Sequence, residues 1–342
     1  LWRCLLGWIG GAGFLLAAAT IFPMLSISGM HIFNPLSSET HTIQIRMGHT
    51  SAWVFMIYLA LTAILFIVLK QENMTGFEAF CYALSTISLS GFSIHDQSIN
   101  FYNSPLIEST LIVFMLMAGL PYHLYLRLSK RDFMSIMNDQ QVRGYLTLIT
   151  FFIIIMSAYL MITERFYFED ALRHSAFKVV SLITTTGFTT QDYELWGPFA
   201  AAVAFIITFI GGCSGSPAGG IKIFRLQILW STLKLHIKKI ATPKGMFFAQ
   251  YNSRALDLET QNEVACFFFV YITIFLVAGA LLMMAGLDFV TAFSGALTSL
   301  SNLGLGLGGI IGPSGDFSTL PSQALWVLST CMILGRFEIF AV

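Results

Sequence analysis

The sequence predicts an all-α polytopic membrane protein, and three observations support this fold class. Of the 342 residues, 56% are hydrophobic and only 11% are charged, and the mean hydropathy is +0.75. These values lie outside the usual range of soluble globular domains. Several apolar stretches reach the length of about 20 residues that a helix needs to cross a bilayer. In addition, a short motif of hydroxyl residues followed by glycine occurs three times.

The charge and the cysteines exclude several other classes of protein. The formal net charge is zero, so we expect no nucleic-acid partner. The cysteines are odd in number and scattered, which argues against a disulfide framework or a thiolate metal site. We interpret them as small packing residues. Both ends of the sequence lie inside hydrophobic runs, so we expect a fragment that lacks an N-terminal part and the extreme C-terminus. The cysteines are Cys4, Cys81, Cys213, Cys266 and Cys331.

The first two apolar stretches, at about 4–26 and 50–69, are each long enough to span a bilayer. A polar connection separates them. Its histidines, His31, His41 and His49, lack the regular spacing of metal ligands, so we interpret them as solvated side chains.

The next apolar stretch, at about 77–87, is too short to cross a hydrocarbon core of about 30 Å. It must therefore enter the membrane and return. Non-helical backbone at that depth is tolerated only where it is buried in protein or lines a water-filled cavity. The loop at 88–91 is thus predicted to face a pore or a site. A third span follows at about 105–128, with a kink expected at Pro121.

The same order of parts recurs twice more, which indicates an internal repeat of span, half-helix, loop and span. Each loop has one hydroxyl residue six positions before its glycine and another three positions before it. Each half-helix starts just after a polar or acidic residue. The later spans are expected at about 144–162, from 195, at 264–286 and from 320, and the half-helices at about 171–183 and 289–300. We divide the chain into 1–28 as the tail of an earlier unit, followed by units at 50–129, 144–240 and 263–342, the last one truncated.

Basic residues gather in the connections between units, and acidic residues follow the loops. By the positive-inside rule, the connections are cytoplasmic and the loops open to the outside. The run from Lys234 to Lys244 suits an anchor for lipid headgroups, or alternatively a docking surface for a cytosolic partner. The basic residues are Arg127, Lys130, Arg131, Arg143, Lys222, Arg225, Lys234, Lys238, Lys239, Lys244 and Arg254, and the acids are Asp96, Asp192, Glu194 and Asp316.

The loops have the chemistry of a cation site. A half-helix points the negative end of its dipole at whatever lies beyond its last residue. Glycine permits conformations in which successive carbonyl oxygens face one axis and replace the water shell of an ion, and hydroxyls can line the same axis. A site without carboxylates suits a monovalent cation better than a divalent one, and potassium is the leading candidate. The alternative is that Ser, Thr and Gly only permit close helix packing. Three matched copies of the motif make this alternative weaker.

Two further features stand out. The span that starts at 195 is broken at 211–220, where five glycines and a proline prevent a regular helix. The break lacks the Gly-Lys-Ser/Thr ending of a phosphate-binding loop. Two interpretations of it stay open: a movable loop that blocks a pathway, or a passive kink. The second feature is Arg336 in the final apolar span. An intramembrane cation usually faces a cavity or a partner, so Arg336 either faces a plugged pathway or is paired with Glu338 or a helix carbonyl.

These motifs resemble the TrkH/KtrB family of bacterial potassium uptake proteins, and specifically its TrkH branch. The resemblance rests on the three loops, on Ser-Pro-Ala-Gly-Gly-Ile-Lys at 216–222 and on Gly-Arg-Phe-Glu at 335–338. It implies four units of span, pore helix and span around a central pore, with one filter glycine in each unit. The implied potassium filter comprises Ser88, Leu89, Ser90, Gly91, Thr184, Thr185, Thr186, Gly187, Ser301, Asn302, Leu303 and Gly304, with the first filter segment upstream of Leu1. The implied gate comprises Gly211, Gly212, Gly215, Ser216, Gly219, Gly220, Lys222 and the pore-facing Arg336.

The resemblance also implies a multi-pass protein of the bacterial inner membrane that is not an enzyme. It implies potassium as the transported ion, no cofactor in this chain, contact with the lipid bilayer, a homodimer, and a cytosolic TrkA-type regulatory subunit that binds nucleotide. The sequence departs from the family at Leu305, where the family usually has proline.

Two functions other than cation conduction fit the sequence less well. An intramembrane enzyme would need an acid, base, nucleophile or metal cluster at membrane depth, yet the sequence has no His-Glu-x-x-His, Gly-x-Ser-x-Gly or paired intramembrane carboxylates. A sodium-coupled carrier is expected to have two broken spans in corresponding halves. This chain has one broken span and three half-helices.

Overall fold

Helices form most of the computed structural model, which describes residues 1–20, 40–128, 137–163, 166–242, 245, 247–252, 254–312 and 315–338. The only strands in these ranges are β1 (Gln250–Tyr251) and β2 (Arg254–Ala255), a single antiparallel pair. Within the same ranges, three helices are long and apolar enough to cross a membrane: α2 (Thr40–Gln71) through its residues 51–71, α7 (Gln140–Thr163) and α11 (Leu258–Met284). The prediction of an all-α membrane fold is confirmed.

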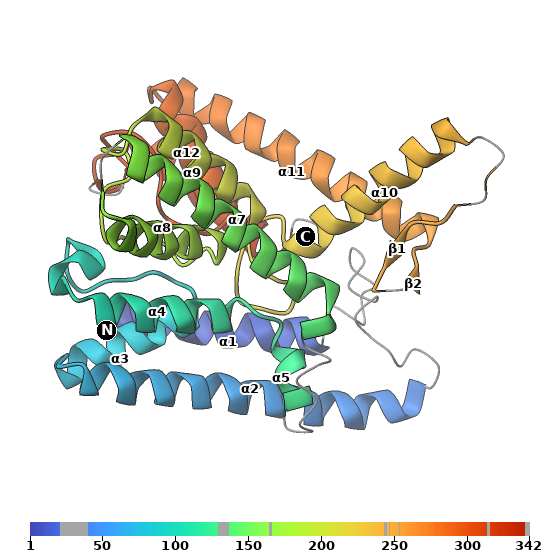
Figure 1. Ribbon diagram of the computed structural model, residues 1–342, viewed down its shortest axis with the longest axis horizontal. Coiled ribbons are helices and arrows are strands. Elements are labelled where there is room, and N and C mark those ends of the chain that lie inside the picture. Colours follow the sequence, from blue (N-terminus) through green and yellow to red (C-terminus); the bar gives the residue numbers. More distant parts are fainter. Residues whose placement is uncertain are drawn as a thin grey trace.

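The first helices, α1 (Trp2–Thr20) and α2, lie side by side and run in opposite directions (Figure 1). They are joined by polar contacts within an apolar interface. The Trp8 indole N–H donates to the Thr62 hydroxyl at 3.1 Å, and the Tyr58 hydroxyl donates to the Trp8 carbonyl at 3.0 Å. The expected span at 4–26 is described only as far as residue 20, and His31 lies outside the described residues. Helix α2 starts well before the expected residue 50, so His41 and His49 belong to it.

The three predicted half-helices are present as α3 (Gly76–Ile87), α8 (Phe168–Ile183) and α12 (Phe289–Leu300). Polar residues fix where two of them begin. Thr75 and Glu78 form a reciprocal capping box at the start of α3, and the Asp288 carboxylate accepts from the Thr291 main chain at 3.1 Å at the start of α12. Such caps satisfy the free N–H groups of a first helical turn.

Two of the expected spans are interrupted. The expected kink at Pro121 is a break between α4 (Pro105–Ala118) and α5 (Tyr122–Leu128). Proline lacks the N–H that would continue the helix. The broken span is divided into α9 (Pro198–Ile210) and α10 (Ile223–Ala241), as predicted. The last span is α13 (Ser322–Arg336), and a short 3₁₀ helix, η2 (Ser98–Tyr102), lies between α3 and α4.

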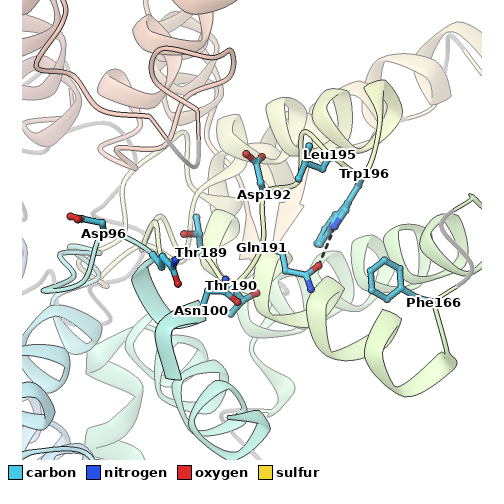
Figure 2. A pocket seen from close by; sticks show the side chains of 10 residues that line it. Asp96, Asn100, Phe166, Thr189, Thr190, Gln191, Asp192, Leu195 and Trp196 are labelled. Carbon is cyan, nitrogen blue, oxygen red and sulfur yellow. Dashed lines mark hydrogen bonds between the residues drawn. The ribbon is translucent and has the colours of Figure 1, made fainter. Parts of the chain in front are cut away.

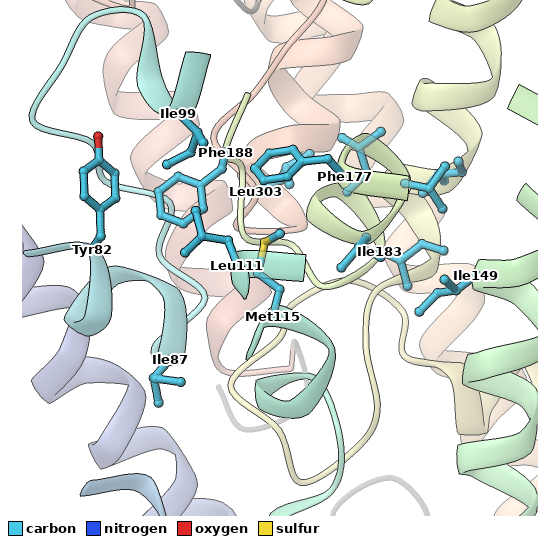
Figure 3. Packing of buried hydrophobic residues seen from close by; sticks show 14 of the residues in the cluster. Tyr82, Ile87, Ile99, Leu111, Met115, Ile149, Phe177, Ile183, Phe188 and Leu303 are labelled. Atoms are coloured by element: carbon cyan, nitrogen blue, oxygen red, sulfur yellow. The ribbon is translucent and has the colours of Figure 1, made fainter. Parts of the chain in front are cut away.

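The main core lies where α3, α4, α7 and α8 meet (Figure 3). Leu111 and Met115 of α4 are fully buried there, as are Phe177 and Ile183 of α8. A second core joins α11, α12 and α13. Lipid tails are as apolar as these side chains, so close packing, more than exclusion of water, holds such helices together.

The outer faces of the long helices carry exposed apolar side chains, among them Ile64, Ile154 and Phe269. Such faces suit contact with the lipid bilayer. Among the cysteines, Cys266 is exposed on α11, and Cys4, Cys81, Cys213 and Cys331 are buried thiols.

Candidate functional site

Each half-helix ends in a segment of the same backbone conformation. We call 88–91, 184–187 and 301–304 the glycine segments. Their first residues continue the helix with φ of −79°, −75° and −82°. Their second residues, Leu89, Thr185 and Asn302, have φ of +54°, +56° and +55°, and their glycines have φ of +68°, +88° and +85°. Three non-glycine residues in the left-handed region at matched positions show a repeated structural device, because that region is uncommon for side chains with a Cβ.

The hydrogen bonds of the glycine segments repeat as well. The N–H of the third residue donates to the carbonyl of the hydroxyl residue six positions before the glycine, at 3.0, 2.9 and 2.9 Å along the chain. The N–H of the second residue donates to the carbonyl five positions before the glycine, at 3.1 Å in all three copies. The side-chain motif in the sequence therefore marks a backbone motif.

The carbonyl oxygens of the glycine segments are left free by this arrangement. None of them accepts a hydrogen bond from any residue that the structure describes. Buried backbone carbonyls are nearly always paired, and the first and second residues of the segments are mostly buried. Rows of unpaired carbonyls are the ligands that a dehydrated cation requires.

The glycine segments lie beside one another. A Cβ atom on Gly91 would lie 1.8 Å from the Thr186 carbonyl oxygen, and one on Gly187 would lie 2.5 Å from the Leu303 carbonyl oxygen. A Cβ atom on Gly304 would meet no described atom within 4 Å. The segment at 184–187 is therefore flanked on both sides, whereas the segment at 301–304 has an open side in the described part of the chain.

The hydroxyls of the glycine segments brace them, in contrast to the expected lining of the axis. The Ser88 hydroxyl donates to the Leu84 carbonyl at 2.8 Å, and the Thr184 hydroxyl donates to the Val180 carbonyl at 2.7 Å. The Ser301 hydroxyl donates across to α9, to Thr208 at 2.9 Å. The Leu84 and Val180 carbonyls also accept from the main-chain N–H groups of Ser88 and Thr184, so the hydroxyls add a second donor there. The Thr208 carbonyl lies in the last turn of α9, where carbonyls have no partner within the helix.

The residues that follow the glycine segments form a mouth. A pocket of about 650 Å³ lies between the stretches after Gly91 and after Gly187 (Figure 2). Asp96 and Asp192 both line it, and each lies five residues beyond its glycine. A pocket with acidic walls raises the local concentration of cations. Its full lining is Asp96, Gln97, Asn100, Phe166, Thr189, Thr190, Gln191, Asp192, Leu195 and Trp196.

The break between α9 and α10 packs directly behind the glycine segments. We call residues 211–222 the interrupted loop. Its Gly219 N–H donates to the Thr185 hydroxyl at 2.8 Å, and a Cβ atom on Gly219 would lie 2.1 Å from the Ser301 carbonyl oxygen. The loop also meets the break before α5, because the Tyr122 N–H donates to the Gly215 carbonyl at 3.0 Å. Its left-handed residues are Gly211, Gly215, Gly220 and Lys222.

Arg336 contacts the interrupted loop. Its guanidinium donates to the Pro217 carbonyl at 2.8 Å and lies 4.6 Å from the centroid of the Phe14 ring. The sequence analysis offers Glu338 or a helix carbonyl as the partner of Arg336, whereas the observed hydrogen bond goes to a carbonyl of the interrupted loop.

The Glu338 carboxylate binds two other cations, Lys222 and Arg225. All three side chains are buried. The sequence analysis places Lys222 and Arg225 in a basic connection, and the structure shows that both side chains are buried against Glu338. Lys222 is the last residue of the interrupted loop, and Arg225 lies in the first turn of α10, three residues further on.

Other basic residues that the sequence analysis places in the connections differ from this pair. Lys234, Lys238 and Lys239 are exposed on α10. Lys130, Arg131 and Lys244 lie outside the described residues.

Leu305, which replaces the usual proline, packs against the main core. The sequence analysis also missed Lys178, a charged residue in the middle of the half-helix α8, although a charge within an apolar stretch is itself a signal.

Known proteins resemble this chain along its whole length. The family model described as "TrkH: Cation transport protein" matches residues 1–342. The Trk system potassium uptake protein TrkI of Halomonas elongata is 36% identical over 345 residues, which cover 100% of this chain and 70% of the relative. TrkH of Salmonella typhimurium is 30% identical over 348 residues, which cover 100% of this chain and 71% of the relative.

A solved structure agrees with these relatives. The crystal structure of the potassium transporter TrkH from Vibrio parahaemolyticus superposes with a TM-score of 0.89 and 29% identity, covering 99% of this chain and 70% of that one. The family consists of transporters, so the alternative of an intramembrane enzyme is set aside. From the fold, the glycine segments and the match over the entire sequence, we conclude that this chain, a multi-pass protein of the inner membrane, belongs to the TrkH family of cation transport proteins.

Proposed function

We propose that this chain provides a membrane pathway for potassium uptake and that the glycine segments form most of its selectivity filter. The observation that carries the proposal is the set of unpaired carbonyl oxygens in three adjacent segments. Each segment follows the carboxyl end of a half-helix, whose dipole favours a cation. Carbonyl oxygens in this arrangement replace the hydration shell of the ion. The relatives named as potassium uptake proteins support potassium as the ion.

A fourth segment of the same kind would complete the filter. The open side beside Gly304 offers room for it, since no described atom lies within 4 Å of a Cβ placed there. The matched relatives are longer than this chain, which covers 70% of TrkI. In this proposal, the fourth segment contributes a carbonyl beside Gly304 as Leu303 does beside Gly187.

The interrupted loop is proposed to act as the gate. It contacts two glycine segments through Gly219, and Arg336 holds it at Pro217. Glycines with left-handed φ at both ends, Gly211 and Gly220, give the loop the backbone freedom that a hinge needs. The proposal extends to a homodimer whose opening is regulated by a cytosolic TrkA-type subunit that binds nucleotide. The exposed lysines of α10 are the proposed contact for that subunit or for lipid headgroups.

Uptake of K⁺ or Rb⁺ by cells that express the full-length protein, with Na⁺ as competitor, tests this function. Gly91→Ser and Gly187→Ser are expected to lower the preference for K⁺ over Na⁺, because each added Cβ would strike a neighbouring carbonyl. Gly13→Ser is the matched control, since a Cβ on Gly13 would meet nothing within 4 Å. An unchanged preference in both filter variants would refute the proposal.

A further inference from the structure

A lysine is buried behind the glycine segment at 184–187. Lys178 lies in α8 and is only 2% exposed. Its ammonium lies 3.7 Å from the centroid of the Tyr193 ring and donates no hydrogen bond to any described residue. The carboxylates of Asp192 and Glu194 supply the opposing charge that acts on it. A buried cation over an aromatic face gains more from that contact than an exposed one does.

The residues that face this lysine connect two parts of the site. The Tyr193 hydroxyl donates to the Gly306 carbonyl at 2.7 Å, and the Glu194 carboxylate accepts from the Gly308 N–H at 2.5 Å. Residues 193 and 194 follow the segment that ends at Gly187, and residues 306 and 308 follow the segment that ends at Gly304. Two consecutive side chains thus tie the outer ends of neighbouring glycine segments together.

The repeated architecture does not require a cation at this position. The residues six positions before the other two glycine segments are Tyr82 in α3 and Gly295 in α12. Tyr82 pairs with the Ser93 hydroxyl at 2.8 Å, within its own unit. The half-helix can therefore form without this contact, which Lys178 adds in one of the three copies.

The geometry points to Lys178 as a positioning residue that sets the spacing between two filter segments through Tyr193. The ammonium fixes the ring from one side. It also withdraws electron density from the ring, which makes the phenol a stronger hydrogen-bond donor to the Gly306 carbonyl. That carbonyl lies two residues beyond Gly304, so its position fixes where the last filter segment ends. This inference rests on the proposed filter function.

Three substitutions in the full-length protein test it by K⁺ uptake with Na⁺ competition, normalised to the amount of protein in the membrane. Lys178→Met removes the charge and keeps the stem, whereas Lys178→Arg keeps a cation that stacks on aromatic rings. Tyr193→Phe keeps the ring and loses the hydroxyl. We expect Lys178→Met to lower the preference for K⁺ over Na⁺ by up to about thirtyfold, the factor that corresponds to one desolvated cation–π contact. We expect Tyr193→Phe to lower it by up to about tenfold, the factor that corresponds to one hydrogen bond.

Two further readouts separate positioning from general stability. Lys178→Arg should restore the preference, and the double variant Lys178→Met/Tyr193→Phe should lose no more than the more affected single variant, because both act on one contact chain. Equal losses in Lys178→Met and Lys178→Arg, additive losses in the double variant, or unchanged selectivity would overturn the inference. If Lys178→Met does not reach the membrane, Tyr193→Phe and Lys178→Arg decide the inference. Unchanged selectivity in Tyr193→Phe, or a loss in Lys178→Arg as large as that in Tyr193→Phe, would then overturn it.

The outcomes also distinguish this inference from the proposed function. Absence of K⁺ uptake by the unaltered protein would count against the function itself. Normal uptake with a Gly91→Ser variant that loses K⁺ preference, together with a Lys178→Met variant that keeps it, would reject only the role of Lys178.

Discussion

The main-chain N–H of Gly219 donates a 2.8 Å hydrogen bond to the hydroxyl of Thr185. The first residue belongs to the interrupted loop and the second to a glycine segment. Thr185 has φ of +56°, a conformation that is uncommon for a β-branched residue. Gly219 in turn lies too close to the Ser301 carbonyl to carry a side chain. The loop and two glycine segments are thus fitted to one another, and any movement of the loop must break the bond to Thr185.

Thr185→Val should loosen the loop. Valine keeps the shape and the branch at Cβ but leaves the buried Gly219 N–H without its acceptor, which costs about 1–3 kcal/mol. This cost destabilises the conformation in which the interrupted loop contacts the glycine segment, so the basal flux of ions through the pathway should rise. Rb⁺ efflux from proteoliposomes measures this flux. Thr185→Ser keeps the hydroxyl and is the control, and equal flux in Thr185→Val and the unaltered protein would contradict the coupling.

Alanine at the three filter glycines tests how the segments are packed. A left-handed φ alone costs an alanine about 1–2 kcal/mol, and at Gly91 and Gly187 the new Cβ would also strike the carbonyls of Thr186 and Leu303. If a fourth segment occupies the open side of Gly304, Gly304→Ala should damage K⁺ preference and thermal stability as much as Gly187→Ala. A markedly milder Gly304→Ala would indicate that this side stays open in the full-length protein.

Much of this fold could be predicted because the relevant signals are local. The half-helix at 289–300 was predicted with its observed bounds, since an acidic cap at Asp288 and a glycine-bearing loop delimit a short apolar run. The break after Ile210 was equally clear from its glycines. The early start of α2 at Thr40 was not predicted, because the residues before 50 are polar and their helical state does not follow from hydropathy.

The pairing of charges could not be read from the sequence. Glu338 binds Lys222 across 116 residues and Arg225 across 113. Arg336, only two residues from Glu338, instead reaches Pro217. Helical spacing indicates which side chains share a face, but the tertiary fold, which brings residue 338 beside residues 222 and 225, decides which cations bind the carboxylate.

Glu338→Gln should destabilise the protein strongly. The change leaves Lys222 and Arg225 buried without the carboxylate that binds both of them, and removing one partner of a buried ion pair typically costs about 3–5 kcal/mol. Thermal unfolding in detergent measures the loss. Lys222→Met is the matched comparison, because it leaves the pair of Arg225 and Glu338 intact and should cost less. A Glu338→Gln variant that melts like the unaltered protein would show that other groups compensate these cations.

Acid should weaken the start of α3 at Glu78. Burial alone would raise the pKa of this carboxyl, but hydrogen bonds from His95 and from Thr75 outweigh it and hold the pKa below its ordinary value of 4.5. The Glu78 and His95 side chains are 3.0 Å apart, and the His95 ring stacks on Phe101 with 3.7 Å between ring centroids.

A carboxyl whose pKa is lower in the folded state stabilises the fold above its unfolded pKa and loses that contribution as the pH falls through its folded pKa. The melting temperature in detergent should therefore drop as the pH is lowered below 4.5, the ordinary pKa of the group. Glu78→Gln can still cap α3 through its side-chain oxygen, so it isolates the ionic contribution. Its melting temperature should lie below that of the unaltered protein at neutral pH and converge with it in acid. A gap that stays constant from neutral pH to about pH 3 would mean that the titration of Glu78 is not what stabilises this end of the helix.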